Sequence, residues 1–468
     1  MNSKAQWGIA GMGVMGTSLS RNFAQKGIPL ALFNRRVEGV EEQVALKKIK
    51  KYPELNQAQA FEDLKGFVDS IERPRKIFLM LAAGKPTTSF LELLSPLLSE
   101  GDVLIDGGNT HYQQTEKRAT SLKEKGILFL GIGVSGGEEG ALKGPSLMVG
   151  GDQKGYEIVK EDLFLVAAKN SKRTPCCSYF GSGGAGHFVK MVHNGIEYAE
   201  MQLLAEVYGL AKTSTLDTTL QQTLYQWNKT ESKSYLLEIT AALLQHQEDG
   251  VSFVEFIQDE ASNKGTGAWA TAAATSLGYP NTLMASALHA RFISSTKSDR
   301  VRFAKQFKTS SKPSEINFSL LKKSYDLSRW INHHQGFEML ASASKSFGWK
   351  LNLSEVASVW AEGCIIKSEL MDFCITLFKK EFSLLLTPAF ESLLASGKKD
   401  WKELLQLAIK NETPIPCMQA AWTYFSSLKT AKSNANIIQA QRDYFGAHGF
   451  LRIDQPKEQL QHGPWASI

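Results

Sequence analysis

The sequence predicts an α/β region followed by an all-helical region, and two observations carry this prediction. Up to about residue 180, short apolar runs alternate with amphipathic stretches, which indicates βα units and a doubly wound parallel sheet buried on both faces. Beyond this point strand-like runs largely stop, and long helical patterns continue to about Ala440. The apolar runs are Trp7 to Ala10, Leu30 to Phe33, Ile77 to Leu81, Val103 to Ile105 and Ile127 to Ile132.

A glycine-rich turn follows the first predicted strand directly. Its sequence is Gly11-Met12-Gly13-Val14-Met15-Gly16, and it opens the first helical pattern. The glycines allow a tight turn, close approach of a pyrophosphate and close packing of helix on strand, while the helix N-terminus attracts the anion. The motif alone is weak evidence. In this strand-to-helix context it indicates a Rossmann-like dinucleotide site.

The end of the second predicted strand indicates which dinucleotide binds. An acidic residue there would bind the ribose hydroxyls of NAD, but this chain has Asn34-Arg35-Arg36. A carboxylate would repel a 2′-phosphate, whereas a guanidinium binds it bidentately. The sequence therefore favours NADP. The alternative reading of Arg35 and Arg36 is a solvated basic turn.

Three further loops follow predicted strands. Ligands of open parallel sheets lie beyond the carboxyl ends of the strands, so we expect these loops to converge near the nicotinamide. Asn109 is the strongest candidate because its amide can bond both cofactor and substrate. Any of the loops could also be only a turn, Asp106-Gly107-Gly108 most readily. The loops are Leu81-Ala82-Ala83-Gly84, Asp106-Gly107-Gly108-Asn109 and Val134-Ser135-Gly136-Gly137.

A stripe of polar side chains runs along the helix predicted after the glycine-rich loop at 181–186. Its members fall at i, i+3, i+4, i+7 and i+8, so they share one face of an otherwise apolar helix. Each alone could be a solvated end or a hydrogen-bonded core residue. Together, a base, an amide, an acid and a phenol on one buried face indicate an active site. The stripe consists of Lys190, His193, Asn194, Glu197 and Tyr198.

The helical half contains a weak internal repeat. The segment His193-Asn194-Gly195-Ile196-Glu197 is matched by His334-Gln335-Gly336-Phe337-Glu338, and a Trp-led helix follows each, at Trp227 and Trp360. A duplicated helical unit is therefore expected, in which Ile331 replaces Lys190 in the second copy. We predict domains at residues 1–183 and 184–440, and a polar tail at 441–468 that no local core would hold.

The composition of the 468-residue chain is that of an ordinary globular protein, with 43% hydrophobic and 21% charged residues. A net charge of +6 fits an anionic small molecule and is too weak to indicate nucleic acid. The cysteines form no CxxC pair, so neither zinc nor a disulfide framework is expected, and a reducing cytoplasm is the simplest setting. No signal peptide or membrane helix is expected. The cysteines are Cys176, Cys177, Cys364, Cys374 and Cys417.

Over nearly its whole length the chain resembles 6-phosphogluconate dehydrogenases. The motifs that carry the resemblance are Asp106-Gly107-Gly108-Asn109, Gly133-Val134-Ser135-Gly136-Gly137, the segment from Gly184 to Tyr198, Asn263-Lys264-Gly265-Thr266-Gly267 and the segment from Gln439 to His448. The resemblance implies oxidative decarboxylation of 6-phosphogluconate to ribulose 5-phosphate and CO2, with reduction of NADP and without metal. This reaction belongs to the pentose phosphate pathway and to gluconate utilization.

The resemblance also implies roles for individual residues. Lys190 would take the proton of the C3 hydroxyl and later return a proton to the C3 oxygen, and Glu197 would protonate C1 of the enediol. Around the sugar acid the family uses positions matched by Asn109, Ser135, Gly136, Gly137, His193 and Asn194. Around the phosphate it uses positions matched by Tyr198, Lys264, Arg291, Arg442 and His448. A homodimer is implied, in which Arg442 and His448 reach the partner's site.

The chain departs from the family at a few positions. Many members have Ala in place of Gly13, Lys in place of Ala82, and Gly or Ala in place of Ser262; Ala82 removes a possible cofactor contact. The segment Ala361-Glu362-Gly363-Cys364 replaces the family's Arg-Gly-Gly-Cys. Two other functions compete with the family's reaction: a shorter β-hydroxyacid dehydrogenase, which would lack Glu197 and the tail, and a non-catalytic NADPH-binding scaffold, against which Lys190 and Glu197 argue together.

Overall fold

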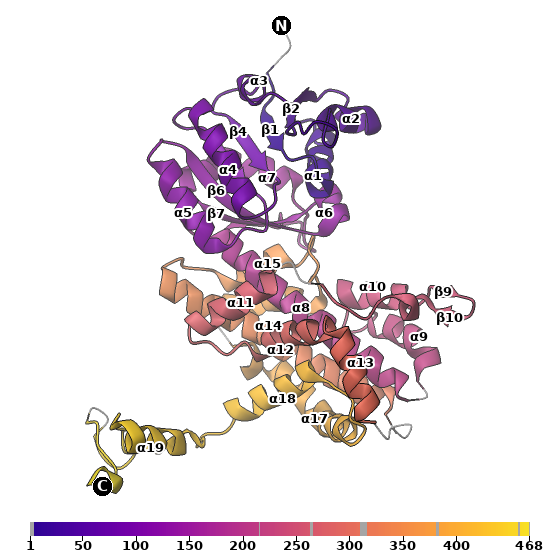
Figure 1. The fold of residues 1–468 in the computed structure, drawn as a ribbon, viewed down its shortest axis with the longest axis vertical. Helices are drawn as coiled ribbons and strands as arrows, with labels where there is room; N and C mark the ends of the chain where they lie inside the picture. The colour runs from indigo at the N-terminus through magenta and orange to yellow at the C-terminus, as the bar shows by residue number, and fades with distance from the viewer. Residues whose placement is uncertain are drawn as a thin grey trace.

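The computed structural model describes residues 4–214, 216–262, 265–308, 316–380, 383–456 and 459–467. A sheet with helices on both faces is followed by a helical body and a small C-terminal unit, which comprises residues 435–456 and 459–467 (Figure 1). The predicted fold class, α/β followed by all-α, is therefore confirmed.

The N-terminal region is built on one eight-stranded sheet of order β3-β2-β1-β4-β5-β6-β7-β8. The order of the first six strands is that of a dinucleotide-binding Rossmann fold. All five predicted strands are present, within a few residues of the predicted bounds. The strands are β1 (Trp7–Ala10), β2 (Leu30–Phe33), β3 (Gln59–Phe61), β4 (Lys76–Leu79), β5 (Val103–Asp106), β6 (Leu128–Ser135), β7 (Ser146–Gly151) and β8 (Cys177–Tyr179).

One strand pair departs from the predicted parallel sheet. β7 runs antiparallel to β6, with Ser135 opposite Ser146, while the other pairs are parallel. The connection between them contains only the seven-residue helix α6 (Gly137–Lys143). A parallel crossover needs a dozen or more residues, so this connection is short enough to return the chain only antiparallel. The apolar pattern itself does not report strand direction.

Helices cover both faces of the sheet, as a doubly wound fold requires. One core packs the sheet against α1 and α7, and another packs it against α3, α4 and α5. Leu19 and Phe23 of α1 are fully buried in the first of these cores. These helices are α1 (Val14–Gln25), α2 (Val44–Lys51), α3 (Leu64–Asp69), α4 (Lys85–Leu94), α5 (Tyr112–Lys123) and α7 (Gln153–Val166).

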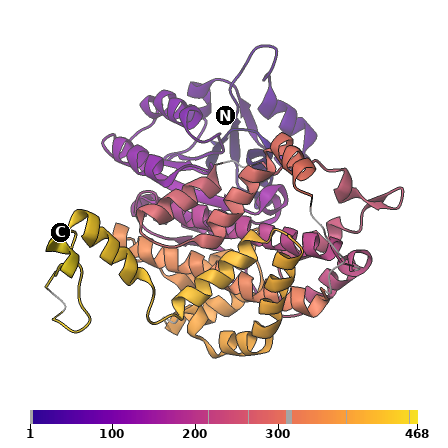
Figure 2. The same ribbon diagram turned by 60° about the horizontal axis from the view of Figure 1, so that its bottom comes forward.

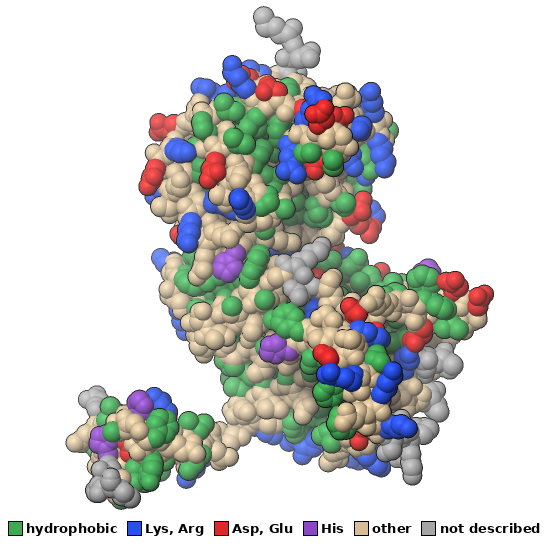
Figure 3. Space-filling model, viewed as in Figure 1, with side chains coloured by type: hydrophobic (Ala, Val, Ile, Leu, Met, Phe, Trp, Pro, Cys, Tyr) green, Lys and Arg blue, Asp and Glu red, His purple; other side chains and the backbone are tan. Residues whose placement is uncertain are grey.

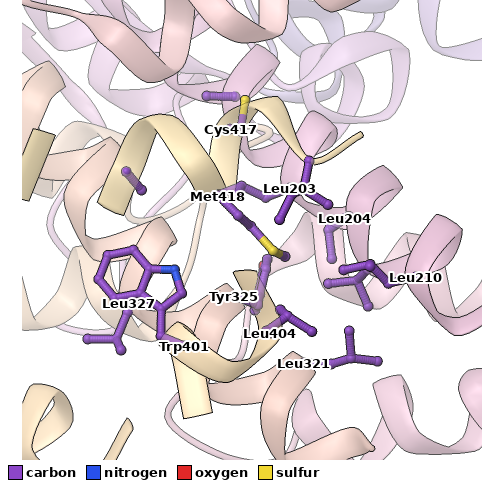
Figure 4. Close-up of a cluster of buried hydrophobic side chains, with 14 of the residues drawn as sticks. Leu203, Leu204, Leu210, Leu321, Tyr325, Leu327, Trp401, Leu404, Cys417 and Met418 are labelled. Carbon is purple, nitrogen blue, oxygen red and sulfur yellow. The ribbon is translucent and has the colours of Figure 1, made fainter. Parts of the chain in front are cut away.

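The helical body is organised around two long helices, α8 (Ala185–Lys212) and α14 (Phe318–Phe347). A large apolar core joins them to α17 and α18; Figure 4 shows Leu203 of α8, Tyr325 of α14 and Trp401 of α17 in this cluster. The other helices are α9 (Asp217–Trp227), α10 (Tyr235–Leu243), α11 (Thr266–Ser276), α12 (Thr282–Ser294), α13 (Lys297–Gln306), α15 (Leu353–Trp360), α16 (Glu369–Leu377), α17 (Pro388–Lys410) and α18 (Pro416–Leu428). A hairpin of β9 (Gln247–Glu248) and β10 (Val251–Ser252) interrupts them.

The predicted duplication is visible in the order and the caps of these helices. Each long helix is followed by a helix that ends at a tryptophan, Trp227 in α9 and Trp360 in α15, so the prediction that the tryptophan leads each helix was wrong. The next helix then begins at a serine N-cap, Ser234 before α10 and Ser368 before α16, and the two caps pair with each other through an antiparallel bridge. α8 and α14 are therefore equivalent elements of the two copies.

The C-terminal unit stands away from the helical body in both views (Figures 1 and 2). It contains α19 (Ala435–Gly446), so its regular structure begins before residue 441. The unit has more local structure than the sequence predicted, because buried Asp443 accepts bonds from the backbone N–H groups of Gly449 and Gly463 and from the side chains of His462 and Trp465. Among the described residues, no helix is long and apolar enough to cross a membrane.

Candidate active site

The first turns of α8 lie directly on β6 and β7 because the facing residues have no side chains. A Cβ at Gly133 would overlap the Cβ of Lys190, and one at Gly150 would overlap the backbone N of Gly186. A Cβ at Gly131 would lie 2.8 Å from Nδ1 of His187. The strand glycines therefore let the backbones approach closely. This approach brings Lys190 to the carboxyl end of β6.

Four residues of the predicted site meet there. The Lys190 Nζ donates to the Ser135 Oγ at 2.9 Å and lies 3.3 Å from the His193 Nδ1, while the Ser135 Oγ lies 3.2 Å from the His193 Nε2. The Glu197 Oε2 lies 3.6 Å from the same His193 Nδ1. Ser135, Lys190 and His193 are buried, whereas the Glu197 side chain is 20% exposed. The imidazole thus separates a primary amine from a carboxyl group.

Burial shifts the pKa values of Lys190 and Glu197 in opposite directions. Loss of water lowers the pKa of Lys190, although the nearby Glu197 opposes this shift. Loss of water raises the pKa of Glu197, opposed by Lys190 and Arg291. Desolvation also holds the pKa of His193 well below its usual value, and the charge of Lys190 adds to this. The pKa shifts are in the directions that would suit a general base at Lys190 and a general acid at Glu197.

The polar stripe continues along α8 toward the first turn of α11. Buried Tyr198 packs under Arg291 of α12, whose guanidinium carbon lies 3.7 Å from the ring centroid. Arg291 also donates to the backbone oxygen of Ser262 at 3.0 Å, and a Cβ at Gly267 would lie 2.8 Å from the Tyr198 ring. The cation at Arg291 is therefore oriented by contacts on both sides. Lys264 lies outside the described residues.

The remaining residues expected around the sugar acid lie at the start of α6, on α8 and in the loop after β5. Gly136 and Gly137, with φ of 114° and 62°, form the turn into α6, a conformation that favours glycine. Asn194 is buried beside His193, and its side-chain hydrogen bond opposes the lowering of the pKa of His193. Asn109 is exposed at the end of the β5 loop. The turn offers backbone N–H groups next to Ser135.

The glycine-rich turn at the end of β1 has the shape that a dinucleotide needs. Gly11 has a φ of 98°, and a Cβ at Gly16 would overlap the Gly11 carbonyl oxygen. A Cβ at Gly13 would meet nothing within 4 Å, and among the described residues no side chain caps α1 at this point. The open space and the uncapped N–H groups fit a pyrophosphate. Met12, Val14 and Met15 complete the turn, and Leu81, Ala82 and Ala83 follow β4.

Asn34 joins this turn to the end of β2. Its Oδ1 accepts from the backbone N–H of Met12 at 3.1 Å, and its Nδ2 donates to Glu41 at 3.2 Å. Arg35 and Arg36 are exposed and pair with Glu41 and Glu42 at 3.3 and 3.4 Å. Exposed pairs of this kind contribute little to stability, about 0–1 kcal/mol. The guanidinium groups therefore remain available to an anionic ligand.

A buried ion pair that sequence reasoning did not single out connects two of the cofactor-side loops. Arg118 of α5 donates to Asp106 at 2.8 Å and to the Gly84 carbonyl oxygen at 2.8 Å. Asp106 also accepts from the backbone N–H of Gly108 at 3.0 Å and from Thr110. Arg118 stands on the buried stripe of an amphipathic helix, a place where an arginine needs a partner. Its place on the apolar face of a predicted helix could have indicated a buried ion pair from the sequence.

The structure does not bring Arg442 and His448 to the α8 cluster of the same chain. Both are exposed on the C-terminal unit, where Arg442 donates to Gln439 at 3.1 Å. The surface of this unit is rich in hydrophobic side chains (Figure 3). They include Ile437, Ile438, Tyr444, Phe445, Leu451, Ile453 and Leu460. All five cysteines are buried as free thiols, and within the described parts of the chain no three His, Cys, Asp or Glu side chains could hold a metal ion.

Comparisons with known proteins decide the family. Residues 6–181 match the model described as the NAD binding domain of 6-phosphogluconate dehydrogenase, and residues 186–465 match its C-terminal domain. The chain is 40% identical over 474 residues to the decarboxylating 6-phosphogluconate dehydrogenase of Escherichia coli K12, with 99% of both chains covered. The chain belongs to the 6-phosphogluconate dehydrogenase family.

Other members of the 6-phosphogluconate dehydrogenase family match with similar completeness. The decarboxylating enzyme of Chlamydia pneumoniae is 39% identical over 471 residues, with 98% of this chain and 97% of the relative covered. The Plasmodium falciparum 6-phosphogluconate dehydrogenase, solved in its apo form and with NADP+ and 6-phosphogluconate, is 33% identical with a TM-score of 0.92, covering 98% of this chain and 100% of that one. Matches over both halves leave no reason to prefer the shorter β-hydroxyacid dehydrogenases.

Proposed function

We propose that the chain catalyses the oxidative decarboxylation of 6-phosphogluconate to ribulose 5-phosphate and CO2, with reduction of NADP. Family membership over the full length supports this reaction. The observation that carries it is the pair Lys190 and Glu197, two turns apart on α8, with pKa shifts in opposite directions. A redox decarboxylation needs a base before carbon–carbon cleavage and an acid after it. One buried helix supplies both.

Lys190 acts at the C3 oxygen of the substrate. As a neutral amine it takes the C3 hydroxyl proton while the C3 hydride leaves, and bound NADP supplies the acceptor for that hydride. The resulting ammonium donates to the C3 carbonyl oxygen as CO2 departs, which stabilises the charge that develops on oxygen. Its hydrogen bond to Ser135 at 2.9 Å fixes the position of Nζ.

Glu197 acts at the carbon from which CO2 has left. As a protonated carboxylic acid it donates to C1 of the enediol, which is C2 of the substrate, and completes the product. The burial that raises its pKa favours the protonated form that this step needs. A carboxyl group with an ordinary pKa would already be ionised near neutral pH.

The substrate lies along the polar stripe of α8. Ser135, Gly136 and Gly137 bind the carboxylate end, and Asn109, His193 and Asn194 hold the hydroxyls. Tyr198, Lys264 and Arg291 bind the phosphate, since several cations around one dianion are favourable. The buried Tyr198 under Arg291 supports this direction, because it places the cation beyond Glu197 along the helix.

NADP binds across the turn from Gly11 to Gly16. The open position of Gly13 and the uncapped start of α1 fit the pyrophosphate. Asn34, Arg35 and Arg36 bind the 2′-phosphate, and Leu81, Ala82, Ala83 and Asn109 line the nicotinamide side. Because Arg35 and Arg36 carry the selectivity, NADP is used in preference to NAD.

The active protein is a homodimer in the cytoplasm, with three functional parts. Residues 1–183 bind NADP, residues 184–440 bind the substrate and form the dimer, and residues 441–468 bring Arg442 and His448 to the partner's site. The exposed apolar side chains of the C-terminal unit support this arrangement, because such a surface is normally covered by a partner.

A direct assay tests the reaction. Purified chain is mixed with 6-phosphogluconate and NADP, and NADPH absorbance and CO2 release are followed together. Equal amounts of both products are expected. NADPH without CO2 would identify a dehydrogenase that does not decarboxylate. Absence of both products from folded protein would contradict the proposed reaction. Faster turnover with NAD than with NADP would show that Arg35 and Arg36 form only a solvated basic turn.

A further inference from the structure

The imidazole of His193 lies between the two groups that exchange protons with the substrate. Its Nδ1 is 3.3 Å from the Lys190 Nζ and 3.6 Å from the Glu197 Oε2. Its Nε2 is 3.2 Å from the Ser135 Oγ, and the ring is fully buried. One nitrogen therefore faces the base and the acid together, and the other is held by β6.

The proposed reaction moves protons to and from Lys190 and Glu197, on either side of His193. Lys190 takes the C3 hydroxyl proton as hydride leaves C3, and returns a proton to the C3 oxygen as the C1–C2 bond breaks and its electron pair forms C2=C3. The resulting enediol then becomes the ketone. Lys190 takes the proton of the C3 oxygen, while the C2=C3 electron pair takes a proton from Glu197.

Turnover therefore ends with the two groups in the wrong ionisation states. Lys190 holds one proton too many and Glu197 one too few, although no proton has been gained or lost overall. Before the next substrate reacts, one proton must pass from the Lys190 Nζ to the Glu197 carboxylate. Lys190 is 7% exposed, so direct exchange with solvent is restricted.

We propose that His193 resets the active site by relaying this proton from Lys190 to Glu197 through its Nδ1. The inference rests on the proposed function and adds a step that follows the chemistry. The Lys190 N–H bond breaks as the Nδ1–H bond forms, and the Nδ1–H bond then breaks as the Glu197 carboxyl O–H bond forms. The imidazole ends as it began, so the step needs no other reactant.

The hydrogen bonds around the ring select the tautomer that such a relay needs. With its proton on Nε2, neutral His193 donates to the Ser135 Oγ, and its Nδ1 lone pair accepts from the Lys190 Nζ. This is one consistent assignment of every contact. Because the relay uses only Nδ1, the tautomer is the same before and after each turnover.

The surroundings of the His193 ring disfavour its protonated form and favour transfer of the proton to Glu197. The centroid of the edge-on Trp360 ring lies 5.7 Å away, and the buried His333 of α14 further lowers the pKa of His193. Burial and the Lys190 charge disfavour imidazolium. That repulsion disappears when the moving proton is the one from Lys190, and the Glu197 carboxylate then attracts it. The distance of 3.6 Å to Glu197 is long, as is common without substrate.

Rapid mixing of His193→Gln with saturating 6-phosphogluconate and NADP tests the relay. The steady state is expected to slow by about 10²-fold, a loss typical of a missing proton-transfer group. The first NADPH per site, which reports only the lost contact of His193 with the substrate hydroxyls, is expected to slow far less and to appear as a burst. Wild type should show no such burst. A first turnover as slow as the steady state, or a steady state at the wild-type rate, would overturn the relay.

Rescue separates a slow reset from slow product release. Imidazole added to His193→Gly, which leaves room for it, should accelerate the steady state without accelerating the first turnover. No acceleration of the steady state would reject the relay. His334→Gln is the matched control, since His334 stands in the equivalent helix beside Glu338 without a lysine, and it should show no burst. Wild type that makes no NADPH would refute the proposed reaction itself.

Discussion

The two long helices α8 and α14 have the same histidine–glutamate pair and different chemistry. In α8 the His193 Nδ1 lies 3.6 Å from Glu197, and in α14 the His334 Nδ1 lies 4.0 Å from Glu338. Burial raises the pKa of both glutamates. The duplicated scaffold therefore supplies an imidazole beside a carboxyl group in each copy, at i and i+4.

The two helices differ in what approaches this pair. α8 has Lys190 and lies against the glycines of β6, which brings Ser135 to the amine. α14 has Ile331 at the equivalent position, and its His334 faces the ring of Tyr424 at 6.0 Å. Burial holds the pKa of His334 at about 4, and the position that corresponds to Lys190 is occupied by Ile331. The proposed active site therefore depends on the amine and the strand end that meet the acid and the imidazole in α8.

The largest effect is expected where the two helices differ most. Lys190→Met should lower kcat by about 10³-fold or more, because the C3 hydroxyl loses its proposed base and the neighbouring His193, whose pKa burial lowers, is a weak substitute. The control is Ile331→Met, a volume-conserving change in the second copy, which should leave kcat unchanged. Steady-state rates with 6-phosphogluconate decide between them. A Lys190→Met enzyme within tenfold of wild type would show that another group is the base.

The next largest difference in kcat is expected between variants of the two glutamates, Glu197 in α8 and Glu338 in α14. Glu197→Gln keeps the shape of the side chain and removes the acid, so kcat should fall by about 10²-fold while KM changes little. Glu338→Gln should leave kcat unchanged. Measurement of kcat and KM for both variants tests the comparison, and equal effects would mean that the two carboxyl groups have the same role.

Two glycines test the contact of α8 with the sheet. Gly133→Ala would push its methyl group into Lys190, and Gly336→Ala would push one into the side chain of Ile196. Both should lower the free energy of unfolding by about 1–3 kcal/mol through overpacking. Only Gly133→Ala should also lower kcat, by about tenfold, since it displaces the base. Denaturation curves and kcat measured on the same samples check this, and unequal stability losses with equal activities would contradict it.

The smallest effect concerns stability and its pH dependence. The folded chain holds fewer protons on Lys190 than the unfolded chain below the usual lysine pKa, so stability rises with pH between the lowered and the usual value. Glu197 acts in the opposite sense, because stability falls as pH rises from its usual to its raised pKa.

Removal of Lys190 should therefore stabilise the fold. Lys190→Met should gain about 1 kcal/mol at neutral pH and flatten the alkaline part of the curve, since a buried ionisable group becomes apolar, as it already is at Ile331. Thermal unfolding across the pH range measures this. A less stable Lys190→Met at every pH would show that the amine contributes to stability.

Much of this organisation followed from the sequence because it depends on local pattern. The strands of the first half, the turn at Gly11 and the stripe on α8 are set by periodicity and by glycine. Strand direction is not set by this pattern. The segments of β3, β7 and β8 were not among the predicted strands, and β7 also runs antiparallel to β6. The meeting of Lys190 with Ser135 joins residues 55 apart, and only the family resemblance indicated it. Arg118 was overlooked because its partners Asp106 and Gly84 come from two other loops.

The shared hold of Arg118 on Asp106 and the Gly84 carbonyl has a consequence for the timing of binding. The loops that follow β4 and β5 both accept hydrogen bonds from the buried Arg118 guanidinium, so together they form a single rigid rim. The entropy of ordering that rim is lost when the chain folds, rather than when the cofactor arrives. A ligand that meets a rigid rim keeps more of its interaction energy as affinity.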